Sequence, residues 1–424
     1  MTPEIKQRIE QIRRGEVPEG YVKKRKVVIP QQWGLPQIKD IASISSGSTP
    51  NRNNSEYWNG NIAWFTTGEL SSGHVNHTSE LITVKAVKET KMRIYPQGTL
   101  LMAMYGQGKT RGTVAILEID AAVNQACAAI TVKDGKSKFL FYQLKNSYQD
   151  IRKLSNTGNQ ENLNADIIKT YQVPWAPDEE QERISTILTT QDKVIELKEK
   201  RLAEKQRQKK YLMQQLLTGK KRLPGFSGEW KNIKLCEVLS ERKEKNVEQN
   251  LRICSVAVQK GVVDQVEHLG RSYAANDTSN YSVAHYGDII YTKSPTGDFL
   301  YGIVKQNLLQ ETVAVSPLYG VFTPLTFGLG YFLHTYFQSA ICARNYLLPI
   351  VQKGAKNTIN ITNDTFISSK LYLPLDVEEQ KAIADTFIAA DREIELLQQD
   401  IEQEKQKKKA LMQLLLTGIV RVKT

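Results

Sequence analysis

Several polar segments of the chain carry side chains whose chemistry suits contact with nucleic acid. Hydroxyl and cationic groups bind phosphates, and amide or guanidinium groups make bidentate contacts with base edges. The candidate DNA-contacting residues are Ser46, Ser48, Thr49, Tyr105, Gln107, Lys109, Thr110, Arg111, Asn156, Asn159, Gln160, Asn162, Lys293, Ser294, Thr296, Lys353, Lys356 and Asn357. Solvated loops and turns have similar compositions, so surface solvation and turn formation are the alternative roles of these residues.

The candidate segments occur in pairs along the chain. The segment that begins at Tyr105 follows an expected strand in the first half, and the segment that begins at Tyr291 has the same place in the second half. Residues 156–164 and 353–360 each precede a long helical stretch. Two domains with one fold but different loops would suit a protein that recognises two different nucleic-acid sequences.

Residue patterns for catalysis and for metal or nucleotide binding are missing. Gly108-Lys109-Thr110 resembles the end of a phosphate-binding loop, but Ala103 occupies the place of the required first glycine and no helix-forming run follows. His74 and His77 lie in a polar loop, and the sequence has no H-E-x-x-H motif. We therefore expect a binding protein with no enzymatic activity, no metal and no cofactor of its own.

One long stretch occurs twice and organises the chain. Residues 179–223 recur without a gap as residues 378–422, with many identical positions. Neither copy contains Gly or Pro before its closing Leu-Leu-Thr-Gly, and both are rich in residues that favour helices. The sequence predicts two helices of about 40 residues, each roughly 60 Å long.

Apolar residues in the two copies share a register with steps of four and three, which is typical of a coiled coil. We expect the two helices to pair through this seam as an antiparallel coiled coil. The predicted helix-pairing residues are Ile184, Leu188, Ile195, Leu202, Leu212, Leu216, Ile383, Phe387, Ile394, Leu397, Ile401, Leu411 and Leu415.

The duplication extends into the globular parts of the chain. Lys23-Lys24-Arg25 precedes Trp33 much as Lys220-Lys221-Arg222 precedes Trp230. Short β-like runs separated by Gly, Asn and Ser follow in both halves, and one helix is expected over residues 139–154 and another over 330–346. The predicted fold is mixed α/β, with two β-rich domains that alternate with the long helices in a pseudo-two-fold repeat. The expected divisions are 1–30 (N-terminal helix and basic lead-in), 31–177 (first globular domain), 178–223 (central helix), 224–375 (second globular domain) and 376–424 (C-terminal helix).

The amino-acid composition indicates the kind of partner and the cellular compartment to expect. The chain has 57 Lys and Arg against 45 Asp and Glu, a formal net charge of +12, which favours a polyanionic partner. Four widely spaced cysteines form neither a zinc motif nor a disulfide framework, so a reducing cytoplasm is expected. No apolar run is long enough to span a membrane, and we expect no membrane association.

The repeat architecture resembles the specificity subunit of type I restriction-modification systems. The helices open with Pro177-Asp178-Glu179-Glu180-Gln181 and Asp376-Val377-Glu378-Glu379-Gln380, and both close with Leu-Leu-Thr-Gly. The second opening has Asp376 in the place of the proline. The resemblance covers nearly the whole chain, apart from the first 22 residues or so.

The resemblance implies that the globular domains are two target recognition domains, each of which reads one half of a bipartite double-stranded DNA target. The paired helices would set the spacing between half-sites and dock adenine methyltransferase (modification) subunits, two in the expected complex. Those partners would carry S-adenosylmethionine, and restriction subunits, where present, would add ATP- and Mg-dependent translocation and cleavage. The alternative is an interaction scaffold, a coiled coil with two protein-binding domains. A steep loss of affinity with added salt would distinguish DNA binding from the scaffold.

Overall fold

The computed structural model describes residues 2–106, 108–154, 162–271, 274, 276–353 and 359–422. The chain divides into two compact units. Unit 1 consists of Met1–Lys198 with Asp400–Thr424, and unit 2 consists of Glu199–Gln399. Unit 1 is therefore built from both ends of the sequence, whereas unit 2 is continuous.

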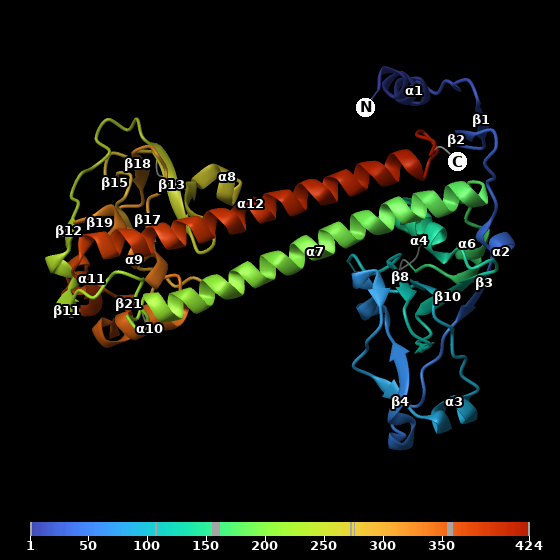
Figure 1. The fold of residues 1–424 in the computed structure, drawn as a ribbon, viewed down its shortest axis with the longest axis horizontal. Helices are drawn as coiled ribbons and strands as arrows, with labels where there is room; N and C mark the ends of the chain where they lie inside the picture. Colours follow the sequence, from blue (N-terminus) through green and yellow to red (C-terminus); the bar gives the residue numbers. More distant parts are fainter. Residues whose placement is uncertain are drawn as a thin grey trace. The chain divides into compact units, whose positions relative to one another are not determined.

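Unit 1 contains a five-stranded sheet of strand order β3-β10-β7-β8-β5 and a three-stranded sheet of order β6-β4-β9. Its elements before the first long helix are α1 (Pro3–Arg13), β1 (Tyr21–Lys24), β2 (Val27–Pro30), α2 (Ile38–Ile41), β3 (Ala42–Ser46), η1 (Ser55–Tyr57), β4 (Trp58–Phe65), η2 (Thr67–Ser72), β5 (His74–Val75), β6 (Leu81–Ile82), α3 (Val84–Thr90), β7 (Leu100–Ala103), β8 (Val114–Leu117), β9 (Ala122–Val123), β10 (Cys127–Val132), α4 (Ser137–Asn146), α5 (Tyr148–Lys153) and α6 (Ala165–Thr170). Adjacent strands are antiparallel except for β5 with β8 and β4 with β9. Within this unit, β4 and α3 lie at the end farthest from α4 (Figure 1).

Unit 2 repeats this plan. Its elements before the second long helix are β11 (Trp230–Lys234), η3 (Leu235–Glu237), β12 (Leu239–Glu241), β13 (Arg252–Ala257), β14 (Gly261–Asp264), α8 (Gln265–Leu269), β15 (Ser282–Ala284), β16 (Ile289–Tyr291), β17 (Val304–Gln306), β18 (Val313–Val315), β19 (Gly320–Pro324), α9 (Phe327–Tyr336), α10 (Ala340–Leu347), η4 (Leu348–Ile350), β20 (Gln352–Lys353), β21 (Ile359–Asn360), α11 (Asn363–Ser368) and β22 (Lys370–Pro374). The order β12-β19-β16-β17 corresponds to β3-β10-β7-β8, and the parallel pair β13 with β18 corresponds to β4 with β9. The predicted mixed α/β repeat is confirmed.

The two long helices are α7 (Asp178–Leu216) and α12 (Val377–Leu415). In unit 1, Ile184 and Leu188 near the start of α7 share a hydrophobic core with Leu415 at the end of α12. In unit 2, Leu216 at the end of α7 shares a core with Phe387 near the start of α12. The helices therefore pair in antiparallel fashion within each unit, and their ends are also packed into the globular cores.

The predicted seam residues lie on the inner faces of these helices. All of them are buried except Leu202, Leu212, Ile394 and Leu411, which are half-buried. Two polar positions of the same register make polar contacts between the helices of unit 1. The Gln191 amide donates to Glu404 at 2.6 Å, and the Lys198 amine bonds Asp400 at 2.8 Å and Glu404 at 2.9 Å.

Two predicted helices and one predicted strand differ from the structure. The stretch 139–154 forms two helices, α4 and α5, which meet at Ser147. The stretch 330–346 is likewise divided into α9 and α10, because the Ser339 hydroxyl caps α10 by accepting from the Cys342 amide. One of the short β-like runs, residues 300–304, was expected to be a strand, but the strand begins only at Val304, since Gly302 has a φ of +96°. Serine and glycine at these points end the regular structure that the apolar pattern would continue.

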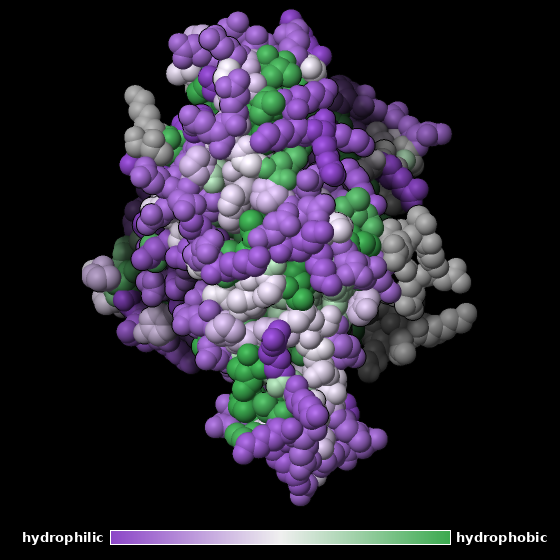
Figure 2. Space-filling model, turned by 90° about the vertical axis from the view of Figure 1, so that its right-hand side faces the viewer, coloured by the Kyte–Doolittle hydropathy of each residue, from purple (hydrophilic) through white to green (hydrophobic). Residues whose placement is uncertain are grey.

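Among the described residues, no helix is both long and apolar enough to cross a membrane. Figure 2 shows a face on which hydrophilic residues dominate and hydrophobic residues form small scattered groups. The face in this view therefore shows no broad apolar surface of the kind that binds a hydrophobic partner.

Candidate nucleic-acid interface

Three loops of unit 1 meet at one end of the five-stranded sheet. The register pairs Ala128 with Ser46, Cys127 with Ala103, and Met102 with Val114. The loops 47–54, 104–113 and 124–126 therefore leave the sheet at the same end. The amide of Leu163 donates to the carbonyl of Met104 at 3.0 Å, which brings the chain that follows residues 155–161 to this end as well.

The loop after β3 has a fixed backbone. A Cβ on Gly47 would lie 2.0 Å from the carbonyl oxygen of Val123, so only glycine fits there. The Trp64 indole donates to the Ser48 carbonyl at 3.0 Å, and the Trp58 indole donates to the Asn51 carbonyl at 3.2 Å. Two buried or half-buried rings thus hold a loop whose polar side chains remain accessible.

Arg52 lies at the centre of this loop. Its guanidinium carbon is 4.2 Å from the centroid of the Trp58 ring and 5.0 Å from that of the Trp64 ring. Its Nη1 also lies 2.5 Å from a carboxylate oxygen of Glu80, while about half of the side chain, 54%, remains exposed. The residue is cationic, restrained and accessible at once.

The loop between β7 and β8 is held by α5. The Tyr148 hydroxyl donates to the carbonyl of Lys109 at 2.6 Å, and Arg152 donates to the carbonyls of Gly108 and Arg111, both at 2.8 Å. These bonds fix the backbone of the loop through side chains that the sequence analysis did not single out.

The structure places the predicted residues of unit 1 as follows. Ser46, Thr49, Tyr105 and Lys109 are exposed at the loop end of the sheet, whereas Ser48, Thr110 and Asn162 are half-buried there. Arg111 is only 7% exposed, which makes it a poor candidate for direct contact with DNA. Gln107, Asn156, Asn159 and Gln160 lie outside the described residues.

Unit 2 gathers its loops at the corresponding end of its sheet, because Tyr291 pairs with both Gly320 and Val304. The loop 292–303 folds on itself through reciprocal bonds of 3.0 Å between Thr296 and Phe299, whose ring is buried. Ser294 and Thr296 are exposed at its tip. Lys293 is half-buried, and burial lowers the pKa of its amine. The structure does not describe three of the predicted positions, which are Lys356, Asn357 and the side chain of Lys353.

Sequence reasoning missed two features of the interface. Arg52 closely follows the candidates Ser46, Ser48 and Thr49 but was not itself a candidate contact, although the two tryptophans downstream of it are a signal for a cation–π contact. The loop after β12, with the exposed cations Lys243 and Lys245, corresponds in position to the loop after β3. The equivalence of strands would have identified it.

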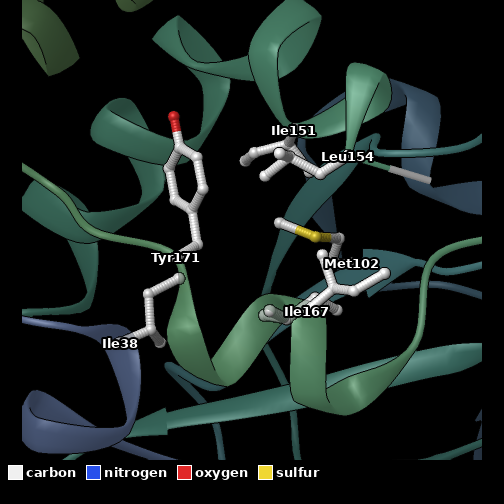
Figure 3. Close-up of a pocket in the computed structure, with 7 residues that line it drawn as sticks. Ile38, Met102, Ile151, Leu154, Ile167 and Tyr171 are labelled. Atoms are coloured by element: carbon white, nitrogen blue, oxygen red, sulfur yellow. The ribbon is translucent and has the colours of Figure 1, made fainter. Parts of the chain in front are cut away.

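Two cavities of unit 1 do not belong to the interface. A small apolar cavity is lined by Ile38, Met102, Ile151, Leu154, Ile167, Ile168 and Tyr171 (Figure 3). It offers no charged group and is a packing feature. A groove of about 800 Å³ lies between α7 and the opposite end of β7 and β8, where Glu118, Asp178, Glu179 and Glu182 outnumber Lys136 and Lys138. Phosphate groups would be repelled from this groove.

Matching polar clamps join each globular core to the helices. In unit 1, the fully buried Glu180 accepts from the Trp33 indole at 2.9 Å and from Arg421 at 2.7 and 2.8 Å. In unit 2, the fully buried Glu379 accepts from the Trp230 indole at 3.2 Å and from two nitrogens of Arg222. The carboxylate comes from the start of one long helix and the guanidinium from the segment that follows the other. Each clamp thereby ties together three distant parts of the sequence.

Comparison with known proteins identifies the family. A family model described as the type I restriction modification DNA specificity domain matches residues 30–206 and again residues 228–406. The chain therefore belongs to the family of type I restriction-modification DNA specificity subunits, which recognise DNA and are not themselves catalytic.

Curated relatives agree with this assignment. The type I restriction enzyme MjaVIII specificity subunit of Methanocaldococcus jannaschii is 24% identical over 93% of this chain and 94% of its own length. The MjaIX specificity subunit of the same organism is 34% identical, but the match spans 41% of this chain and 40% of that protein. The chain thus matches one relative along nearly its full length and the other over less than half.

Solved structures share the fold. The S subunit of a type I restriction-modification system from M. genitalium superposes with a TM-score of 0.54 at 12% identity, over 95% of this chain and 99% of that chain. A chain from a structure of the type I R-M system superposes with the same TM-score at 14% identity, over 92% and 99%. The fold is therefore shared along nearly the whole of this chain.

Proposed function

We propose that the loop ends of the two sheets read the two halves of a bipartite double-stranded DNA target, unit 1 one half and unit 2 the other. The observation that carries the proposal is the repetition of one strand order with different loops at the same end of each sheet. A common frame presents both sets of loops, and their different side chains would select different bases.

The chemistry of the loops supports this assignment. Exposed hydroxyl and cationic groups, including Thr49, Lys109, Ser294 and Thr296, combine phosphate binding with contacts to base edges. The net charge of +12 favours association with a polyanion. The backbones of residues 47–54 and 108–111 are held by indole, hydroxyl and guanidinium donors, so these residues have little order to gain on binding.

The partners form the second part of the proposal. Adenine methyltransferase subunits, two per chain, would dock on the specificity subunit in the cytoplasm, and restriction subunits would join where the host has them. S-adenosylmethionine, ATP and Mg would bind to these partners, and this chain would contribute only target selection.

Exchange of residues 31–177 for the equivalent segment of a relative tests whether each unit recognises its own half-site. Methylated adenines would be mapped in the host genome before and after the exchange. We expect one half-site to change while the other half-site is retained. A change in both halves would show that the units do not read DNA separately.

The salt dependence of DNA binding separates this function from that of a protein scaffold. The purified complex would be titrated with a duplex that carries the mapped target between about 50 and 200 mM salt. Phosphate contacts predict a linear fall of log K with log salt and a loss of about a thousandfold or more if at least six phosphates are contacted. An affinity that does not respond to salt would favour the scaffold.

A further inference from the structure

Arg52 combines features that distinguish it from an ordinary surface arginine. Its guanidinium lies within cation–π distance of both Trp58 and Trp64, and Glu80 bonds one of its nitrogens, so three side chains restrict its orientation. A surface arginine loses several rotatable bonds of freedom when it binds a ligand, whereas this one is already restrained in the free protein.

The remaining donors of Arg52 are available at the surface. A guanidinium carries five N–H groups, and the described hydrogen bonds of Arg52 engage Nη1 with Glu80. Two of its neighbours use their side-chain oxygens in the local turn: Asn51 Oδ1 accepts from the backbone amide of Asn53, and Asn54 Oδ1 accepts from the backbone amide of Glu56. Arg52 is the cationic donor of this loop, and its orientation is restrained by the contacts with Trp58, Trp64 and Glu80.

We propose that Arg52 is a specificity-determining residue that reads a guanine in the half-site of unit 1, with Glu80 as its positioning residue. Two parallel N–H donors match the O6 and N7 acceptors that guanine presents in the major groove, and no other base offers this pair. The inference rests on the proposed function, because it names a base contact within the same interface.

A phosphate contact is the competing role for an exposed cation, and geometry argues against it. Arginine can bind a phosphate bidentately, but a phosphate accepts donors from many directions, whereas the O6 and N7 atoms of guanine accept them from one direction in the plane of the base. The two indole rings and the carboxylate of Glu80 restrict the orientation of the guanidinium, and Glu80 also reduces the net charge of the site. The site of Arg52 has less net positive charge and a more restricted guanidinium than a simple phosphate contact needs. These properties suit a contact with a base edge better than neutralisation of a phosphate.

The test compares Arg52→Lys with the wild-type chain in the assembled methyltransferase complex. Lysine keeps the charge and loses the planar fork. Methylated adenines would be mapped genome-wide, and binding would be measured on duplexes in which each position of the mapped half-site carries each of the four bases in turn. We expect one guanine position in one half-site to become degenerate, with discrimination there falling roughly 10- to 100-fold and all other positions unchanged.

Lys88→Ala is the control, since it removes an exposed cation of α3 in the same unit without touching the loop. It should leave base preference unchanged. An Arg52→Lys complex that binds all duplexes more weakly by one common factor would overturn the inference and assign Arg52 to a phosphate.

Glu80→Gln keeps the inference testable if the Arg52 variant gives no methylation at all. The glutamine keeps an acceptor oxygen but loses the negative charge, so it holds the guanidinium less firmly and discrimination at the same guanine should fall in part. An unchanged preference at every position would overturn the proposal. If instead no bipartite motif depends on the chain, even in the wild type, it is the proposed function that fails.

Discussion

At the scale of single residues, the two buried carboxylates of Glu180 and Glu379 show what the duplication preserves. Each is fully buried and is satisfied by one indole and one guanidinium. Burial of an unpaired carboxylate would cost several kcal/mol, so the donors must be present for the helix to pack on the domain. The loops differ between the units, whereas these contacts do not.

Removal of one carboxylate should destabilise unit 2. In Glu379→Ala, the Trp230 indole and Arg222 lose their acceptor in a buried site, and we expect the free energy of unfolding to fall by about 2–3 kcal/mol. Denaturant unfolding followed by circular dichroism measures the change. Glu378→Ala, which alters the exposed neighbour, should have almost no effect. Equal losses in the two variants would mean that the clamp is not a stabilising contact.

The second residue-level prediction concerns acid. Hydrogen bonds from Gln191 and then Lys198 lower the pKa of Glu404 from 4.5 to about 2. Because the folded-state pKa is depressed, this stabilisation is present above pH 4.5 and is lost as the pH falls toward 2. Glu404→Gln should therefore be less stable than wild type at pH 7, and the difference should shrink between about pH 5 and pH 3.

Thermal midpoints measured across this pH range test the expectation. Glu402→Gln is the matched variant, since Glu402 is exposed on the same helix. A constant difference between wild type and Glu404→Gln at all pH values would show that Glu404 does not titrate in this way.

At the scale of elements, the loop after β3 depends on one glycine. Gly47→Ala places a methyl group against the Val123 carbonyl, so β3 and β9 must separate and the Arg52 loop must move. We expect weaker DNA binding, roughly tenfold or more, and a lower thermal midpoint of unit 1. Gly34→Ala is the control, because its Cβ would meet no atom closer than 3.5 Å. An unchanged affinity for DNA in Gly47→Ala would mean that this loop does not take part in DNA binding.

The sequence predicted the elements better than it predicted their interruptions. Long periodic stretches without Gly or Pro, such as residues 178–216, identified both long helices because helix propensity and the apolar seam agree. The break at Ser147 was not predicted, since the apolar residues on either side continue the same helical pattern and only the packed core decides where the chain turns.

The site was less predictable than the fold, for a physical reason. The side-chain chemistry of Ser46, Ser48 and Thr49 pointed to the loop after β3, but the restraint on Arg52 comes from the rings of Trp58 and Trp64 in β4. The burial of Arg111 likewise depends on how the loop folds onto α5. The contact of Glu180 with Trp33 and Arg421 was not predicted. It requires three distant segments of the chain to meet in space, and spacing in the sequence alone cannot specify this.

At the scale of the whole molecule, the length of the long helices should influence which targets are accepted. Deletion of residues 203–206 shortens α7 by four residues, about 6 Å at the rise of an α-helix. We expect the methylated motif to keep both half-sites and to change the number of bases between them. Gln208→Ala preserves the length of the helix and should preserve the spacer. An unaltered spacer after the deletion would mean that the helices do not set it.

The construction of unit 1 from both ends of the sequence also determines the order in which the protein can mature. During synthesis, residues 199–399 are complete before Met412, Leu415 and Arg421 leave the ribosome, so unit 2 can fold while unit 1 still lacks part of its core. Until those last residues arrive, Glu180 lacks its arginine partner and the apolar face of α7 stays uncovered. A chain released early would thus expose the half-finished unit to proteases and chaperones.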